Sequence, residues 1–207
     1  MNKEIESQLR DWSQEIPELS EEHREAVAIL SNYVTHKLDT GVPPAIQFIC
    51  THNSRRSQMA QAWSAAIADY FGLAVRSYSG GTEATQIAPL TLEALYECGF
   101  DVAEEDGDNA KTKVAWRPNS AGATLFSKRF DYSGNVSKKF LAVMTCSDAD
   151  ENCPVVPGAE ERIPLTFEDP GKFDNTEEAL DEYISTCLNI GYVLFLAYAR
   201  AKELIND

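Results

Sequence analysis

The chain has 207 residues, of which 43% are hydrophobic, enough for one domain with a full core and some additions. Its formal net charge of −15 argues against binding to nucleic acid or an anionic membrane, because both need a basic surface. The N-terminus, MNKEIESQLRDW, has no apolar segment of signal-peptide length, and the longest apolar run, 188–199, is too short to span a bilayer. We therefore expect a cytoplasmic protein whose cysteines stay mostly reduced.

Two amphipathic helices are predicted in the first 43 residues. The apolar residues of 3–16 and of 20–39 recur at helical spacing: Ile5, Leu9, Trp12 and Ile16, then Val27, Leu30, Val34 and Leu38. We expect a helical hairpin over 1–43 as an extension that precedes an α/β domain over 44–207. Its apolar stripes must be buried, either on a domain or across a homodimer formed through these helices.

An apolar strand over 45–49 runs directly into Cys50, and Arg56 and Ser57 precede a predicted helix over 57–71. A loop that closes onto a helix N-terminus aims backbone N–H groups inward, which favours bound anions and a thiolate. Arg56 can grip two oxyanion oxygens, and Ser57 can donate a hydrogen bond to the sulfur of Cys50. The alternative is a buried strand-end cysteine beside a surface arginine. We expect an oxyanion-binding loop made of Cys50, Thr51, His52, Asn53, Ser54, Arg55 and Arg56.

The rest of the chain alternates strands and helices. We expect a strand near 74–78, a helix over 88–98, a strand over 140–144, and a helix from about 176 to 204 that Asn175 and Glu178 would cap. Residues 103–139 form an insertion that could hold a hairpin near 133–135, and that either covers the site or is only an addition. The alternation implies a parallel sheet covered on both faces, with ligands at the carboxyl ends of its strands, where Cys50 and Cys146 both lie.

A second pair of cysteines follows the strand over 140–144. Cys146 and Cys153 are separated by six residues, too many for a metal knuckle, and no second pair accompanies them, so we expect no metal site. A redox pair fits better, because the polar segment SDADEN can bend to bring the two thiols together. The alternative is two incidental cysteines. Cys98 and Cys187 are expected to be small core residues.

The segment CTHNSRRSQMAQAW resembles the phosphate-binding loop of the low-molecular-weight tyrosine phosphatase superfamily. It is most similar there to the thioredoxin-coupled arsenate reductases, whose loop reads much like C-T-G-N-S-C-R-S-Q-M-A-E-x-W. His52 stands in place of a Gly and Arg55 in place of a Cys. The resemblance implies a monovalent cation near Asn53 and Ser79, although Gln61 stands where the reductases often carry a Glu that helps to hold potassium.

The resemblance also implies a three-layer sandwich with a central, mostly parallel four-stranded sheet. In the implied mechanism, Cys50 attacks arsenate and Asp169, in the loop PLTFEDPG, protonates the departing oxygen. Cys146 then attacks Cys50 and releases arsenite, Cys153 attacks Cys146, and thioredoxin reduces the last disulfide. No cofactor other than this thiol relay is implied.

Two other functions stay open. A phosphatase acting on phosphotyrosine or a small phosphoester would use Cys50, Arg56 and Asp169 without Cys146. Such phosphatases tend to place aromatic residues directly after the Asp-Pro, and the Gly-Lys-Phe over 171–173 favours a small inorganic oxyanion instead. The second alternative is a non-catalytic oxyanion or redox sensor.

Overall fold

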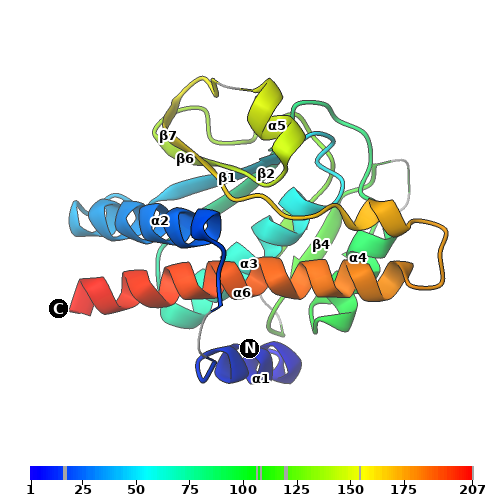
Figure 1. The fold of residues 1–207 in the computed structure, drawn as a ribbon, viewed down its shortest axis with the longest axis horizontal. Helices are drawn as coiled ribbons and strands as arrows, with labels where there is room; N and C mark the ends of the chain where they lie inside the picture. Colours follow the sequence, from blue (N-terminus) through cyan, green and yellow to red (C-terminus); the bar gives the residue numbers. More distant parts are fainter. Residues whose placement is uncertain (16–17, 106, 108, 119–120, 154, 207) are drawn as a thin grey trace.

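A four-stranded parallel sheet forms the centre of the computed structural model (Figure 1), which describes residues 1–15, 18–105, 107, 109–118, 121–153 and 155–206. The strands run in the order β2-β1-β6-β7. They are β1 (Ala45–Cys50), β2 (Arg76–Gly81), β6 (Phe140–Met144) and β7 (Ala159–Pro164). All residues of β1 and β6 are buried, as expected for parallel strands covered on both faces. The predicted sheet is confirmed.

Helices cover one face of this sheet. They are α2 (Glu21–Asp39), α3 (Arg56–Phe71) and α6 (Ala179–Asn206), with α3 packed directly on β1 and β2, while α4 (Pro89–Glu97) packs on α6. The side chains of Phe48 and Val143 point from the sheet into this helical core. The helix α3 ends at Gly72, whose positive φ of 68° suits a left-handed C-terminal cap. The predicted cap of α6 is wrong, because Asn175 lies in a turn with φ of 67°, before the helix begins.

The other face is covered by the short helix α5 (Ser147–Asn152) and by part of the insertion. Ile49 and Met144 pack there with Phe130. A Cβ on Gly80 would lie 2.4 Å from the Cα of Phe130, so the glycine permits this close approach. Part of the insertion therefore forms an outer layer of the fold.

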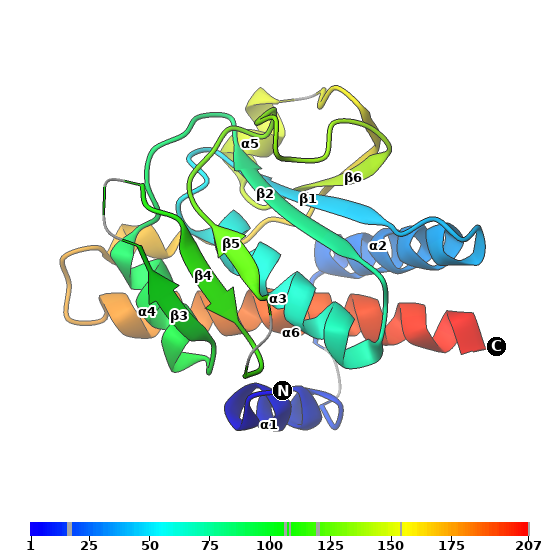
Figure 2. The same ribbon diagram turned by 180° about the vertical axis from the view of Figure 1, so that it is seen from behind.

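The insertion also forms a second, antiparallel sheet, seen beside β2 in Figure 2. Its strands, in order, are β3 (Asp101–Glu104), β4 (Thr112–Ala115) and β5 (Ala123–Leu125). The hairpin predicted near 133–135 is wrong: that segment holds a turn in which the Asn135 amide donates to the Tyr132 carbonyl at 2.8 Å. Gly134 lies in this turn, and no pair of described strands flanks it.

The two N-terminal helices share the main core but do not form a hairpin. The helices α1 (Lys3–Trp12) and α2 lie on opposite sides of α6 (Figures 1 and 2), and the apolar stripes of both are buried in the core that contains α6. Trp12 and Trp63 close over Gly191 of α6, where a Cβ would lie 2.7–2.8 Å from their rings. The amphipathic pattern located the buried faces, which pack on the domain, one of the two expected arrangements; the expected pairing of the two helices with each other is not observed. Ile16, the last residue of the predicted stripe, lies outside the described residues.

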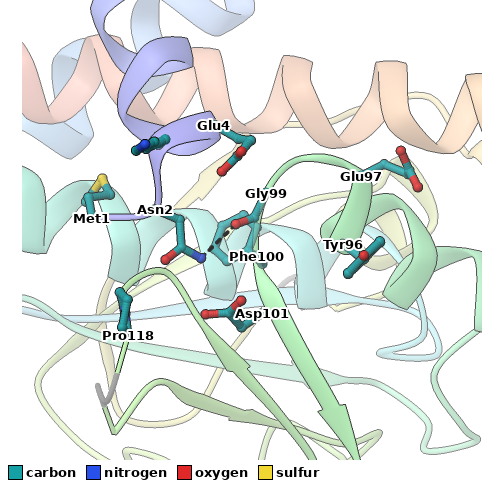
Figure 3. A pocket seen from close by; sticks show the side chains of 10 residues that line it. Met1, Asn2, Glu4, Tyr96, Glu97, Gly99, Phe100, Asp101 and Pro118 are labelled. Atoms are coloured by element: carbon teal, nitrogen blue, oxygen red, sulfur yellow. Dashed lines mark hydrogen bonds between the residues drawn. The ribbon is translucent and has the colours of Figure 1, made fainter.

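The chain start is fixed beside the end of α4. Figure 3 shows the Asn2 side chain donating to the Gly99 carbonyl, at 2.9 Å, in a cavity of about 610 Å³. The lining of this cavity shares no residue with the loop over 50–56.

By length and composition, α6 is the one described helix that could cross a membrane. Its buried side chains lie in the core of the domain, among them Tyr183, Leu194 and Tyr198, which are all 0% exposed. A core helix satisfies the same criteria of length and composition, so α6 is weak evidence for a membrane.

Candidate active site

Cys50 ends β1 at the point where the chain turns into α3. It is 4% exposed, and its Sγ lies 3.0 Å from Ser57 Oγ and accepts from the Asn53 amide at 3.2 Å. Donors directed at the sulfur, next to a helix N-terminus, stabilise negative charge there. The structure therefore brings together Cys50, Asn53, Ser57 and the start of α3, as the sequence predicts.

Asn53 supports the loop from behind. It takes a left-handed backbone with φ of 48°, and its side chain donates to Ser57 Oγ at 2.7 Å while accepting from the Lys128 amide at 3.0 Å. His52 does not need a positive φ, so a His is accommodated where the related loops carry Gly. Its side chain is half-exposed, with Nε2 3.6 Å from a carboxylate oxygen of Glu83.

Gly81 on the neighbouring strand lets the loop close. It is in register with Cys50, and a Cβ on it would lie 2.6 Å from the Thr51 carbonyl oxygen and 2.8 Å from the Asn53 nitrogen. The residues after Gly81 then hold the loop, because the Thr82 amide donates to the Cys50 carbonyl at 3.1 Å. Any side chain at this position would push into the loop.

Arg56 and Asp169 form an ion pair at the mouth of the loop. Arg56 Nη2 donates to Asp169 Oδ2 at 2.8 Å, and Nη1 donates to the Phe167 carbonyl at 2.9 Å. Asp169 Oδ1 accepts from the Gly171 amide at 3.1 Å, at the start of the 3-10 helix η1 (Pro170–Phe173). The predicted oxyanion ligand and the predicted general acid thus lie in direct contact.

Arg55 ties the loop to two other segments, which the sequence did not indicate. Its Nε donates to the Tyr183 hydroxyl at 2.6 Å and its Nη2 donates to Asp174 at 2.8 Å. Tyr183 also donates to Asp174 at 2.8 Å. Burial raises the pKa of Tyr183 to about 12, so its phenol stays protonated at neutral pH. The positive charge of Arg55 is therefore engaged in holding Asp174, next to η1, and Tyr183 of α6 against the loop.

A small cavity of about 50 Å³ lies inside the loop, lined by residues that include Cys50, Ser54, Arg56 and Asp169. A cavity of about 440 Å³ adjoins it, and Arg55, Arg56, Asp148 and Asp169 line both. The inner space exceeds the volume of about 10–15 Å³ that one water molecule needs, so it can hold a small ion. A small oxyanion would meet the thiol at its base and the Arg56–Asp169 pair at its mouth.

Cys146 lies at the end of the strand next to β1. Ile49 is in register with Met144, and Cys146 follows two residues later, with its Sγ 3.5 Å from Thr51 Oγ1. Cys146 is 1% exposed and caps α5, accepting from the Ala149 amide at 3.4 Å. Cys153 caps the other end of the same helix and is partly exposed. Pro154, the next residue, lies outside the described residues.

The two remaining cysteines are buried in the helical core. Cys187 is fully buried and accepts from the Trp63 indole N–H at 3.3 Å, and Cys98 lies beside it. Burial raises the pKa of Cys187, which keeps it a thiol at neutral pH. Their predicted placement in the core is confirmed.

Comparison with known proteins assigns this architecture to a family. Residues 45–113 match the profile described as low molecular weight phosphotyrosine protein phosphatase. A protein of Halalkalibacterium halodurans named arsenate reductase is 32% identical over 133 residues, which are 64% of this chain and 78% of that protein. The chain therefore belongs to the low-molecular-weight phosphotyrosine phosphatase family.

A second relative agrees with this assignment. The protein of Bacillus subtilis named arsenate reductase is also 32% identical over 133 residues, again covering 64% of this chain and 78% of that protein. A solved structure of an arsenate reductase from Archaeoglobus fulgidus is 21% identical and covers 78% of this chain and 99% of that chain, with a TM-score of 0.47.

Proposed function

We propose that this chain is a cytoplasmic arsenate reductase in which Cys50 is the nucleophile and Cys146 and Cys153 form a thiol relay that thioredoxin recycles. The observation that carries the proposal is the placement of Cys50 and Cys146 at the carboxyl ends of two neighbouring strands, with Thr51 bridging toward the second sulfur. The relatives named arsenate reductase support it.

The first half of the proposed reaction takes place inside the loop. The Cys50 thiolate attacks the arsenic(V) centre, an As–S bond forms, and an As–O bond breaks as Asp169 gives its proton to the departing oxygen. Arsenate displaces the carboxylate of Asp169 from Arg56. The displaced carboxylate takes up a proton from solvent and, as the acid, gives it to the departing oxygen, which leaves as water.

The second half oxidises two thiols. Cys146 attacks the sulfur of Cys50, the S–As bond breaks, and its electron pair leaves with arsenic as arsenite. Cys153 then attacks Cys146, which frees Cys50 and leaves a Cys146–Cys153 disulfide. Two thiols have then lost two electrons to arsenic, and a reduced dithiol such as thioredoxin returns them. The partly exposed position of Cys153 suits exchange with an external thiol.

The phosphatase alternative has its own support, because Cys50, Arg56 and Asp169 are arranged as hydrolysis of a phosphoester requires. Dimerisation through the N-terminal helices stays a prediction, although their stripes are already buried within one chain.

The experiment that separates these functions replaces Cys146 by Ser. Arsenite production with thioredoxin, thioredoxin reductase and NADPH is expected to fall to background in Cys146→Ser, while turnover of p-nitrophenyl phosphate survives if it is present. Cys98→Ser is the matched control, because its thiol lies in the helical core and is expected to leave both activities unchanged. Undiminished arsenate reduction by Cys146→Ser would contradict the relay, and oxyanion binding without any turnover by the unaltered protein would favour a sensor.

A further inference from the structure

A buried lysine lies behind the oxyanion loop. Lys128 is 6% exposed, and its Nζ donates to Ser79 Oγ and to the Phe126 carbonyl, each at 3.2 Å. The Phe126 ring lies 4.6 Å from the same nitrogen, within range of a cation–π contact. Among the residues that the structure describes, no carboxylate forms an ion pair with this ammonium. Lysines are rarely buried without a charged partner, so its position calls for an explanation.

The neighbours of Lys128 lead to the nucleophile by two routes. Ser79 Oγ lies 2.6 Å from Gln61 Oε1 and 3.3 Å from Gln58 Oε1, and the Gln58 side chain donates to the Asn53 carbonyl at 2.8 Å. The second route is through the backbone, because the Lys128 amide donates to the Asn53 side chain, which in turn donates to Ser57 beside Cys50. A charge on Lys128 therefore acts on the loop through fixed, buried dipoles.

The oxygens around the ammonium are those that a monovalent cation would need. The resemblance implied such a cation near Asn53 and Ser79, but the Ser79 hydroxyl already accepts from Lys128. Gln61 contributes a neutral amide where an acidic residue would attract a metal cation. The residues present do not fit a bound potassium ion, because a second positive charge would have to enter beside the first with no carboxylate to offset it.

We propose that the Lys128 ammonium is the resident cation behind the oxyanion loop, and that this protein neither needs nor binds a potassium ion at Ser79. Lys128 is a positioning residue: it touches no reacting atom, and it fixes the polar network that holds Asn53 and Ser57 against Cys50. Because no carboxylate neutralises it, its positive charge favours a thiolate on Cys50 and an oxyanion in the loop.

The ionisation of Lys128 is compatible with this role. Burial lowers the pKa of Lys128 to about 8, so the group is mostly protonated at neutral pH. A thiolate or an oxyanion in the loop adds a negative charge that favours the protonated form further.

The first test uses the unaltered protein in potassium, sodium or choline chloride at equal ionic strength. Its melting temperature, and its rate of alkylation by iodoacetamide at Cys50, followed by mass spectrometry of the peptide, are expected to be the same in all three salts. A saturable increase in melting temperature that potassium alone produces would overturn the proposal.

The second test replaces Lys128 by Met, which keeps most of the length of the side chain and removes its charge. The rate of alkylation of Cys50 at pH 7 is expected to fall several-fold, because the positive charge that favours the thiolate is lost. Lys111→Met is the matched control, because that lysine is exposed and lies over the same Phe126 ring, at 5.8 Å, and its loss should leave the rate unchanged. An unchanged rate in folded Lys128→Met would refute the role of the charge. If that variant does not fold, the salt comparison decides alone. Neither test involves arsenate turnover, so both are independent of the proposed function.

Discussion

Arg162 of β7 holds α5, the helix that separates Cys146 and Cys153, the two cysteines of the proposed relay. Its Nε donates to the Cys153 carbonyl at 3.1 Å, its Nη2 donates to the Asp150 carbonyl, and Nη2 lies 2.6 Å from Asp150 Oδ1 as an ion pair. Cys146 and Cys153 cap opposite ends of α5, so a rise of about 1.5 Å per residue separates their Cα atoms by about 10 Å. A disulfide needs about 4.4–6.8 Å, so α5 must open before the second disulfide can form.

Replacing Arg162 by Met should therefore accelerate the second thiol exchange. Hydrogen bonds from a charged donor contribute about 1.5–3 kcal/mol each, and the low end applies here because the Arg162 side chain is 22% exposed. If opening α5 breaks both bonds and water replaces part of them, their loss lowers the cost of opening by about 2 kcal/mol. At 1.4 kcal/mol per factor of ten, the exchange should become about 30-fold faster.

The assay follows a single turnover. Reduced protein is mixed with arsenate, quenched in acid at intervals, alkylated, and analysed by mass spectrometry for the Cys50–Cys146 and Cys146–Cys153 disulfides. Arg10→Met is the control, because Arg10 is exposed and pairs with Glu6 of its own helix α1, at 3.4 Å. An unchanged or slower conversion to the second disulfide in folded Arg162→Met would show that Arg162 does not restrain the helix.

Two further predictions concern the loop and the response to acid. Gly81→Ala should weaken the binding of arsenate or phosphate, measured by calorimetry, at least about tenfold, because its Cβ would meet the Thr51 carbonyl. Gly72→Ala is the control: it should cost only about 1 kcal/mol of unfolding free energy and leave binding intact. The hydrogen bond from Lys37, with a second from Tyr33, lowers the pKa of Glu160 in the folded protein. The stability that this carboxylate contributes is therefore complete above the unfolded-state pKa of about 4.5, and it is lost as the pH falls through the lower pKa of the folded state. In acid titrations of the melting temperature, Lys37→Met should lose less stability than the unaltered protein between about pH 5 and 3; an identical loss would contradict the link.

The sequence predicted those parts of the molecule in which local pattern and tertiary structure agree. Apolar runs bounded by turn residues located β1 and β6, and helical periodicity located α2 and α3. The strand β7, read AEERIP, was not predicted, because it lies at the edge of the sheet and its charged residues hide the alternation. The short strands β3–β5 gave too few residues for a period to be recognised.

At the site, the loop and its immediate donors could be predicted because they are contiguous in sequence. The contacts of Arg55 with Tyr183 and of Lys128 with Ser79 could not, because they join residues 128 and 49 positions apart. No periodicity marks a lysine in an irregular insertion as buried. The only available signals were the departures from the related loops, at Arg55 and Gln61, and both lie in these unpredicted networks.

The packing at Gly191 has a consequence for how the chain holds together. Helix α6 is lined on one side by α2, and Trp12 of α1 covers the glycine notch beside Trp63. A chain that began at residue 44 would expose this notch and the ring of Phe195, which Trp12 contacts at 5.9 Å between centroids. Such a shortened protein would expose an apolar aromatic surface that favours association between its copies. The N-terminal segment therefore completes the core around α6 and keeps this aromatic surface covered.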